Sequence, residues 1–204
     1  YAHVPWMRPN QKMIDEKDLP GAAERLQQAE AAREVLLANG YAAVGLDHFA
    51  RPNDPLARAA AAGHLHRNFQ GYTVDAADAL IGLGASSISR FPQGFTQNAP
   101  DAASYMRAID AGRFATVRGI AFTPEDIARG AYIERLMCDL QVDLDTPTFD
   151  EAAPRLASLA ADGLVTIEGH HVAMTATGRP FVRLAAAALD ARLQQSAARH
   201  SAAV

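Results

Sequence analysis

The most constraining feature of the sequence is a helical segment that ends at a glycine and is followed directly by a short apolar run. In residues 22–39 the apolar side chains recur at roughly helical spacing, and Gly40 stands where a helix usually stops. Residues 41–49 are apolar and short enough for one buried strand. Because a helix, a glycine and an apolar strand in this order are typical of α/β folds, we predict such a fold for the first half of the chain.

The second half of the sequence is predominantly helical. Residues 101–111 favour a helix, and a clearer helix starts where Thr123 and Asp126 form a capping box around Pro124. A further helix of two to three turns is expected to end at Gly163. These segments predict mostly α structure for this half of the chain.

A hairpin and a last helix are expected towards the end of the chain. Residues 164–175 alternate apolar and polar side chains on either side of a turn, which predicts two paired strands. Residues 178–193 carry apolar side chains on one helical face. The order helix, helix, hairpin, helix predicts a winged-helix-like module.

The composition changes near residue 95, and we predict two domains, residues 1–95 and 96–204. The winged-helix-like part of the second domain has no excess of positive charge. Residues 148–204 contain five arginines and five acidic residues, whereas a DNA-binding module normally presents basic charge on its contact face. We therefore predict no nucleic-acid partner.

Charge and hydropathy exclude several other classes of protein. The net charge of −4 gives no broad basic surface for nucleic acids or anionic membranes. No apolar run approaches the roughly 20 residues of a membrane span. The single cysteine, Cys138, excludes a disulfide framework and an all-cysteine metal site built from this chain alone. The sequence therefore predicts a cytoplasmic protein with no membrane association and no metal ligands of its own.

The segment HRNFQGYT, residues 66–73, is the strongest candidate for a binding surface. It places a cation, Arg67, beside two amide side chains, Asn68 and Gln70, around one glycine. A guanidinium binds carboxylates through two parallel hydrogen bonds, and the amides add hydrogen bonds without charge. A structural role remains open, in which Arg67 pairs with Asp47 or Asp75.

Other candidate residues are weaker. His48 follows Asp47 at the end of the predicted strand, where ligands gather in α/β folds, although a structural hydrogen-bonded pair is an equally good interpretation. The GLGAS segment, residues 82–86, has the glycines of a phosphate-binding loop but neither a complete glycine motif nor a lysine. The histidine pairs His64 and His66, and His170 and His171, lack the spacing of a metal site.

Several segments together resemble one known family. They occur in the order YAHVPWMRPNQKMID, GLDHFARPNDPLA, LHRNFQGYT, LIGLGASSIS, the TQN of residues 96–98, and IERLMCDL. With these segments the chain resembles the C-terminal portion of an oxygen-independent coproporphyrinogen III oxidase. This is a radical S-adenosylmethionine (SAM) enzyme of heme biosynthesis, and the resemblance covers essentially the whole chain.

The resemblance implies a fold, an activity and cofactors. The expected fold is the C-terminal part of a partial (β/α) barrel followed by a helical, winged-helix-like domain. The family oxidatively decarboxylates two propionates of coproporphyrinogen III to vinyl groups, using a 4Fe-4S cluster, two SAM molecules and an electron donor. The cluster is bound through a CxxxCxxC motif, which this sequence lacks, and Cys138 matches a position that is not a ligand. We therefore expect the cluster-binding half to precede Tyr1, and the chain alone to be inactive.

The resemblance also implies individual site residues. Ala2 matches a position that contacts the second SAM, and Ile88 matches one that contacts the first. Gln70 matches a polar residue that lines the active site, and Arg67 is our own candidate for binding a substrate carboxylate. The alternative to part of an enzyme is a binding module without catalysis, either a heme or porphyrin carrier or a winged-helix regulator.

Overall fold

The computed structural model describes residues 3–6 and 8–193, and its contacts divide the chain into two compact units. The first unit comprises residues 1–65 and 132–204, and the second comprises residues 66–131. The domain division predicted at residues 95 and 96 stays a prediction, and its boundary lies within strand β6 (Gly94–Asn98).

The first unit begins with two short 3₁₀ turns, η1 (Pro9–Met13) and η2 (Glu16–Asp18), and the long helix α1 (Ala22–Ala38). The helix expected for residues 22–39 is therefore confirmed. Gly40 follows it in the left-handed region, with φ of 80°, which a glycine adopts without steric cost.

The single buried strand predicted for residues 41–49 is wrong. The chain instead forms an antiparallel hairpin of β1 (Ala42–Val44) and β2 (His48–Ala50). Gly45 has a φ of 56°, and this left-handed residue lets the backbone reverse within the apolar run. Helix α2 (Pro55–Ala61) follows, and the carboxylate of Asp54 caps its first turn.

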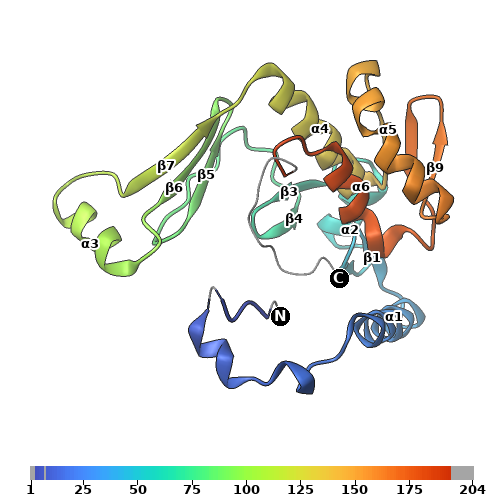
Figure 1. The fold of residues 1–204 in the computed structure, drawn as a ribbon, viewed down its shortest axis with the longest axis horizontal. Coiled ribbons are helices and arrows are strands. Elements are labelled where there is room, and N and C mark those ends of the chain that lie inside the picture. The colour runs from blue at the N-terminus through green and yellow to red at the C-terminus, as the bar shows by residue number, and fades with distance from the viewer. Residues whose placement is uncertain (1–2, 7, 194–204) are drawn as a thin grey trace. The chain divides into compact units, whose positions relative to one another are not determined.

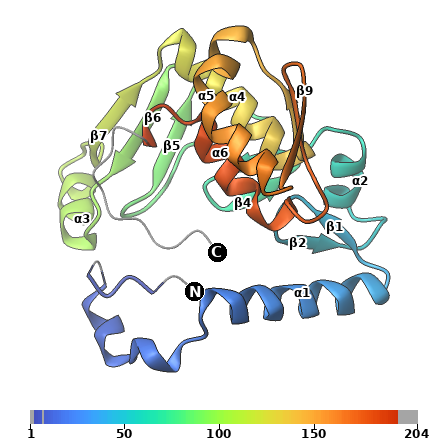
Figure 2. The ribbon, with the colours of Figure 1, turned by 45° about the vertical axis from the view of Figure 1, so that its right-hand side comes forward.

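The C-terminal part of the first unit contains a small antiparallel sheet and two helices. Strands β8 (Gln141–Asp143), β10 (His171–Met174) and β9 (Val165–Glu168) lie in that order, so the predicted hairpin is confirmed and gains a third strand. Helices α5 (Thr146–Ala161) and α6 (Val182–Leu189) lie side by side next to the hairpin (Figure 2).

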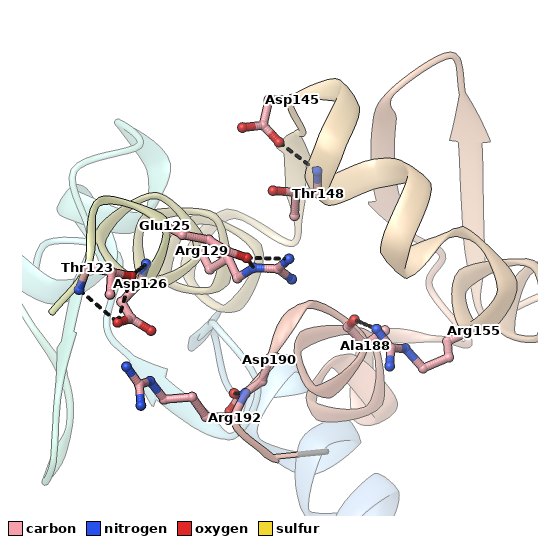
Figure 3. Close-up of polar contacts among 10 residues, drawn as sticks. All are labelled: Thr123, Glu125, Asp126, Arg129, Asp145, Thr148, Arg155, Ala188, Asp190 and Arg192. Atoms are coloured by element: carbon pink, nitrogen blue, oxygen red, sulfur yellow. Dashed lines mark hydrogen bonds and ion pairs between the residues drawn. The ribbon is translucent and has the colours of Figure 1, made fainter. Parts of the chain in front are cut away.

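Two helices differ in length from the prediction. Helix α5 has 16 residues rather than two to three turns, because it already begins directly after Asp145, whose carboxylate accepts a hydrogen bond from the Thr148 backbone N–H (Figure 3). The helix predicted for residues 178–193 is shorter: a 3₁₀ turn, η3 (Arg179–Phe181), precedes α6. Asp190 ends α6, since it is extended and its carboxylate accepts hydrogen bonds from the following backbone N–H groups.

One hydrophobic core holds this part of the first unit together. The Arg155 guanidinium reaches across from α5 and donates to the carbonyl oxygen of Ala188 in α6 at 2.6 Å (Figure 3). Arg179 donates to the carbonyl oxygen of Gly45, which ties η3 to the turn of the β1–β2 hairpin. The fully buried large side chains of the core are Leu136, Leu156, Val172, Val182 and Leu189.

The second unit consists of a hairpin, a three-stranded sheet and a helix. The hairpin pairs β3 (His66–Asn68) with β4 (Gly71–Thr73), and the sheet has the order β5 (Ile88–Phe91), β6, β7 (Thr116–Ala121). Helix α3 (Ala102–Asp110) connects β6 to β7 at the end of this long ribbon (Figure 1).

Helix α4 (Pro124–Asp139) leads from the second unit into the first. Its predicted capping box is confirmed: the backbone N–H of Thr123 donates to Asp126, and that of Asp126 donates to the Thr123 hydroxyl (Figure 3). The fold is mixed helix and sheet, as expected. Every strand pairing among the described residues is antiparallel, and these strands form no closed barrel.

Candidate functional site

The HRNFQGYT segment forms a tight β-hairpin with Phe69 and Gln70 at its turn. Asn68 and Gly71 are paired residues at the ends of β3 and β4. The side-chain oxygen of Asn68 accepts a hydrogen bond from the Gln70 backbone N–H at 2.9 Å, which fixes the turn. The two amide side chains proposed from the sequence are therefore held close together.

The aromatic residue of the turn connects the hairpin to the sheet. Phe69 packs edge-on against Phe95 of β6, with ring centroids 5.2 Å apart, and Phe95 packs in the same way against Phe122. More than half of the Phe69 side chain is still exposed, at 54%. This ring therefore presents an apolar surface beside the two amides.

The glycine-rich segment that precedes β5 is held by side chains from β6 and α3. The Asn98 side-chain amide donates to the carbonyl oxygens of both Gly82 and Gly84, at 3.1 Å each. The backbone N–H of Gly84 in turn donates to the Tyr105 hydroxyl at 3.1 Å. The loop has no regular structure of its own, so these bonds determine its shape.

Further contacts pack the loop closely against β5. The Gly82 backbone N–H donates to the buried Ser89 hydroxyl, and a Cβ at Gly82 would lie 2.7 Å from the carbonyl oxygen of Ile88. Ser86 adopts a left-handed conformation with φ of 62°. The backbone of this loop therefore lies close against the backbone of β5.

The hairpin turn and this loop enclose a hollow of about 490 Å³, which we call the amide hollow. It brings together three predicted site residues, Asn68, Gln70 and Ile88, from two separate segments of the sequence. Its walls combine amides, hydroxyls and apolar side chains. The lining residues are Asn68, Phe69, Gln70, Leu80, Ile81, Gly82, Leu83, Ser86, Ser87 and Ile88.

A second hollow, of about 280 Å³, lies on the sheet, and we call it the sheet hollow. It shares Phe69 and Ile88 with the amide hollow. Arg118 of β7 is its one charged lining residue, and the side-chain oxygen of Gln97 accepts two hydrogen bonds from this guanidinium. The lining residues are Phe69, Ile88, Phe95, Thr96, Gln97, Arg118, Gly119 and Ile120.

Two other predicted site residues, Arg67 and His48, do not line either hollow. Arg67 packs its guanidinium over the ring of its cross-strand partner Tyr72, 4.9 Å from the centroid. His48 belongs to the first unit, where its Nδ1 lies 2.9 Å from the carboxylate of Asp47. Ala2 lies outside the described residues.

The histidine pairs show no metal-binding arrangement. His171 contacts the carboxylate of Asp143 at 2.8 Å, while His170 stacks on the ring of Phe149. Within residues 3–6 and 8–193, no three His, Cys, Asp or Glu side chains gather as metal ligands. Cys138 is buried in the first unit.

Three residues of this region had no role in the sequence-based reasoning: Ser89, Tyr105 and Arg118. Ser89 and Tyr105 hold the loop backbone, and Arg118 supplies the charge of the sheet hollow. Their partners lie 7 to 21 residues away in the chain, so no local motif marks them. Among the described helices, none is both long enough and apolar enough to cross a membrane.

Comparison with known proteins identifies relatives of one kind. The chain is 49% identical over 198 residues to an oxygen-independent coproporphyrinogen III oxidase from Cereibacter sphaeroides, covering 93% of this chain and 44% of that protein. It is 47% identical over 212 residues to the protein of that name from Paracoccus denitrificans, covering 100% of this chain and 47% of the relative. No protein-family model matches the chain.

A solved structure extends the similarity to the fold. Coproporphyrinogen III oxidase (HemN) from Escherichia coli, described as a radical SAM enzyme, superposes with a TM-score of 0.87 at 36% sequence identity. The match covers 94% of this chain and 46% of that protein. The chain thus spans about half the length of the relatives that it matches.

Proposed function

Because this chain belongs to the oxygen-independent coproporphyrinogen III oxidase family, we propose that it forms part of the active-site wall of such an enzyme. The proposed reaction of the whole protein is the oxidative decarboxylation of two propionates of coproporphyrinogen III, which gives protoporphyrinogen IX. The observation that carries the proposal is the amide hollow, in which Asn68, Gln70 and Ile88 lie together.

The cofactors proposed for the whole protein are a 4Fe-4S cluster and SAM, with an electron donor as a further partner. In the whole protein, together they would supply the radical chemistry for hydrogen abstraction from the propionate. A cluster of this type needs several cysteine thiolates, and this chain has only the buried Cys138. The residues present therefore do not fit the cluster, and none of them is proposed as a ligand.

The residues of the amide hollow fit SAM better. Ile88 and the neighbouring Leu80 give an apolar wall, and the loop backbone that packs against β5 gives this wall a fixed shape. We assign Ile88 to contact with one SAM molecule. Ala2, outside the described residues, is assigned to contact with a second.

The amides are assigned to the substrate. Gln70 and Asn68 donate hydrogen bonds to carboxylates without adding charge, so they orient a propionate and leave its chemistry to the cofactors. Arg67 and His48 are proposed as further substrate-binding residues, although neither lines the amide hollow.

The proposed architecture places this wall in a larger fold. Residues 1–95 would complete a partial (β/α) barrel, and residues 96–204 would form a helical domain with a winged-helix-like part. The zero net charge of residues 148–204 argues against nucleic-acid binding by this part.

A chimaera tests the proposed function, in an assay that also contains a low-potential reductant as the electron donor. This chain replaces the matching segment of the Paracoccus denitrificans relative, and the purified protein, with its cluster reconstituted, is assayed anaerobically with SAM and coproporphyrinogen III. We expect protoporphyrinogen IX as the product. A chimaera that folds and carries its cluster but forms no product, while the unmodified relative is active, overturns the proposal.

A further inference from the structure

We propose that Arg118 binds a carboxylate in the sheet hollow, which takes up one propionate-bearing edge of the substrate. The identity of this ligand as a tetrapyrrole with four propionates rests on the proposed function. The assignment of Arg118 to one of its carboxylates does not follow from that function, and comes from the geometry of the second unit.

The guanidinium of Arg118 is held in a defined orientation. The side-chain oxygen of Gln97 accepts hydrogen bonds from both Nε, at 2.7 Å, and Nη2 of Arg118. The side-chain nitrogen of Gln97 donates to the carbonyl oxygen of Ser86 at 2.9 Å, so the amide cannot rotate without losing this bond. Gln97 and Arg118 are also cross-strand partners in β6 and β7. The cation is therefore positioned before any ligand arrives.

Most of the binding capacity of Arg118 remains available. A guanidinium has five N–H groups, and Gln97 accepts from two of its nitrogens, which leaves Nη1 without a hydrogen bond among the described residues. Gln97 is neutral, so the positive charge is not compensated. None of the residues that line the sheet hollow is acidic. The hollow therefore favours an anion, and a planar carboxylate matches a guanidinium best.

Most of the remaining sheet hollow is apolar. Phe69, Phe95, Ile88 and Ile120 line it together with the cation, and Phe69 and Ile120 are substantially exposed. A simple inorganic anion would leave these side chains in water, whereas a carboxylate attached to a bulky apolar group would cover them. A propionate on a pyrrole ring has both parts.

The position of the sheet hollow links Arg118 to the proposed active-site wall. Phe69 and Ile88 line both hollows, so a ligand whose carboxylate binds Arg118 extends past them towards Gln70. Arg67 lines neither hollow, and its guanidinium packs on the ring of Tyr72 instead. Arg118 is thus the arginine that the geometry favours as a substrate-binding cation.

Porphyrin binding to the chain tests this assignment. The probe is coproporphyrin III, the stable oxidised form that keeps all four carboxylates, titrated against the chain by fluorescence in a mild detergent. Its tetra-methylamide, which lacks the charges, is the matched ligand. We expect Arg118→Gln to weaken binding of the tetracarboxylate about tenfold and to leave binding of the amide unchanged. Arg113→Gln is the control, because it removes the same charge from an exposed residue of the second unit outside both hollows. This variant should bind both ligands as tightly as the original chain does.

A structural role of Arg118 is distinguished by the ligand comparison. If Arg118→Gln only disturbed the sheet, both ligands would weaken equally and the inference would be wrong. Arg118→Lys keeps the charge and should restore part of the preference for the tetracarboxylate. The inference is also overturned if coproporphyrin III shows no saturable binding, or if Arg118→Gln does not weaken that binding. Neither outcome would contradict an active chimaera. An inactive chimaera would overturn the proposed function but not Arg118-dependent carboxylate binding.

Discussion

Gly178 stands where the chain leaves β10 and turns into η3, and a side chain has no room there. A Cβ at this position would overlap the carbonyl oxygen of Leu164, which accepts hydrogen bonds from Thr175. The Gly178 backbone N–H also donates to the Thr175 hydroxyl at 2.9 Å. This contact fixes the start of η3 against the end of β10, and the Leu164 atoms that the Cβ would meet are backbone atoms that cannot simply rotate away.

We expect Gly178→Ala to lower the free energy of unfolding by about 2 kcal/mol or more, because the backbone must shift to admit the methyl group. Gly130→Ala is the control: a methyl group on this exposed glycine of α4 would meet no other atom within 4 Å, and alanine there should raise the free energy of unfolding by about 1 kcal/mol. Urea unfolding of both variants measures the difference. Equal stabilities would contradict the packing at Gly178.

At the residue scale, the structure groups three of the predicted site residues in one place. Asn68, Gln70 and Ile88 lie in one hollow, as a shared site requires. Arg67 belongs to the same motif, but its cross-strand pairing with Tyr72 places the two side chains on one face of the hairpin, where they stack. The sequence motif does not reveal this pairing. The sequence alone therefore could not show that Arg67, unlike Asn68 and Gln70, does not line the amide hollow.

At the scale of elements, helix ends were predictable because their signals are local. The capping box at Thr123, the cap at Asp101 and the stop at Gly40 all lie within a few residues of the helices that they bound. Strands were less predictable: the six residues of β7 are all exposed, so no apolar alternation marks them, and the strand exists through its pairing with β6.

The cap of α3 predicts a pH dependence. The backbone N–H of Ser104 donates to the Asp101 carboxylate and lowers the pKa of this group below its ordinary value of 3.8, because the bond favours the charged form. A pKa lowered by folding adds stability above the unfolded-state pKa, and this contribution is lost as the pH falls through the folded-state value.

Asp101→Asn keeps a capping side chain but removes the titration. The stability advantage of the original chain over this variant should therefore be larger at pH 6 than at pH 3. Urea unfolding of both proteins at the two pH values measures it, and titration of the remaining acidic groups cancels in the comparison. An advantage that stays constant, or grows towards pH 3, would contradict the assigned role of the Asp101 carboxylate.

At the scale of the whole molecule, the residues of the two hollows are all contributed by residues 66–131, whereas the large hydrophobic core lies in the first unit. In the first unit, the helices were largely predictable from glycine stops and local apolar spacing, whereas the β1–β2 hairpin was not. The grouping of the hollow residues was not, since it depends on pairing between segments that lie far apart in sequence.

The most direct test of the central claim is the catalytic efficiency of the chimaera with and without Gln70. The amide of Gln70 is proposed to orient a substrate propionate, so Gln70→Ala should lower kcat/KM for coproporphyrinogen III about tenfold, with cluster content and thermal stability unchanged. Gln93→Ala is the matched control, because Gln93 is an exposed turn residue outside both hollows and should have no effect. An unchanged kcat/KM in Gln70→Ala would contradict the assignment of the amide hollow as the active-site wall.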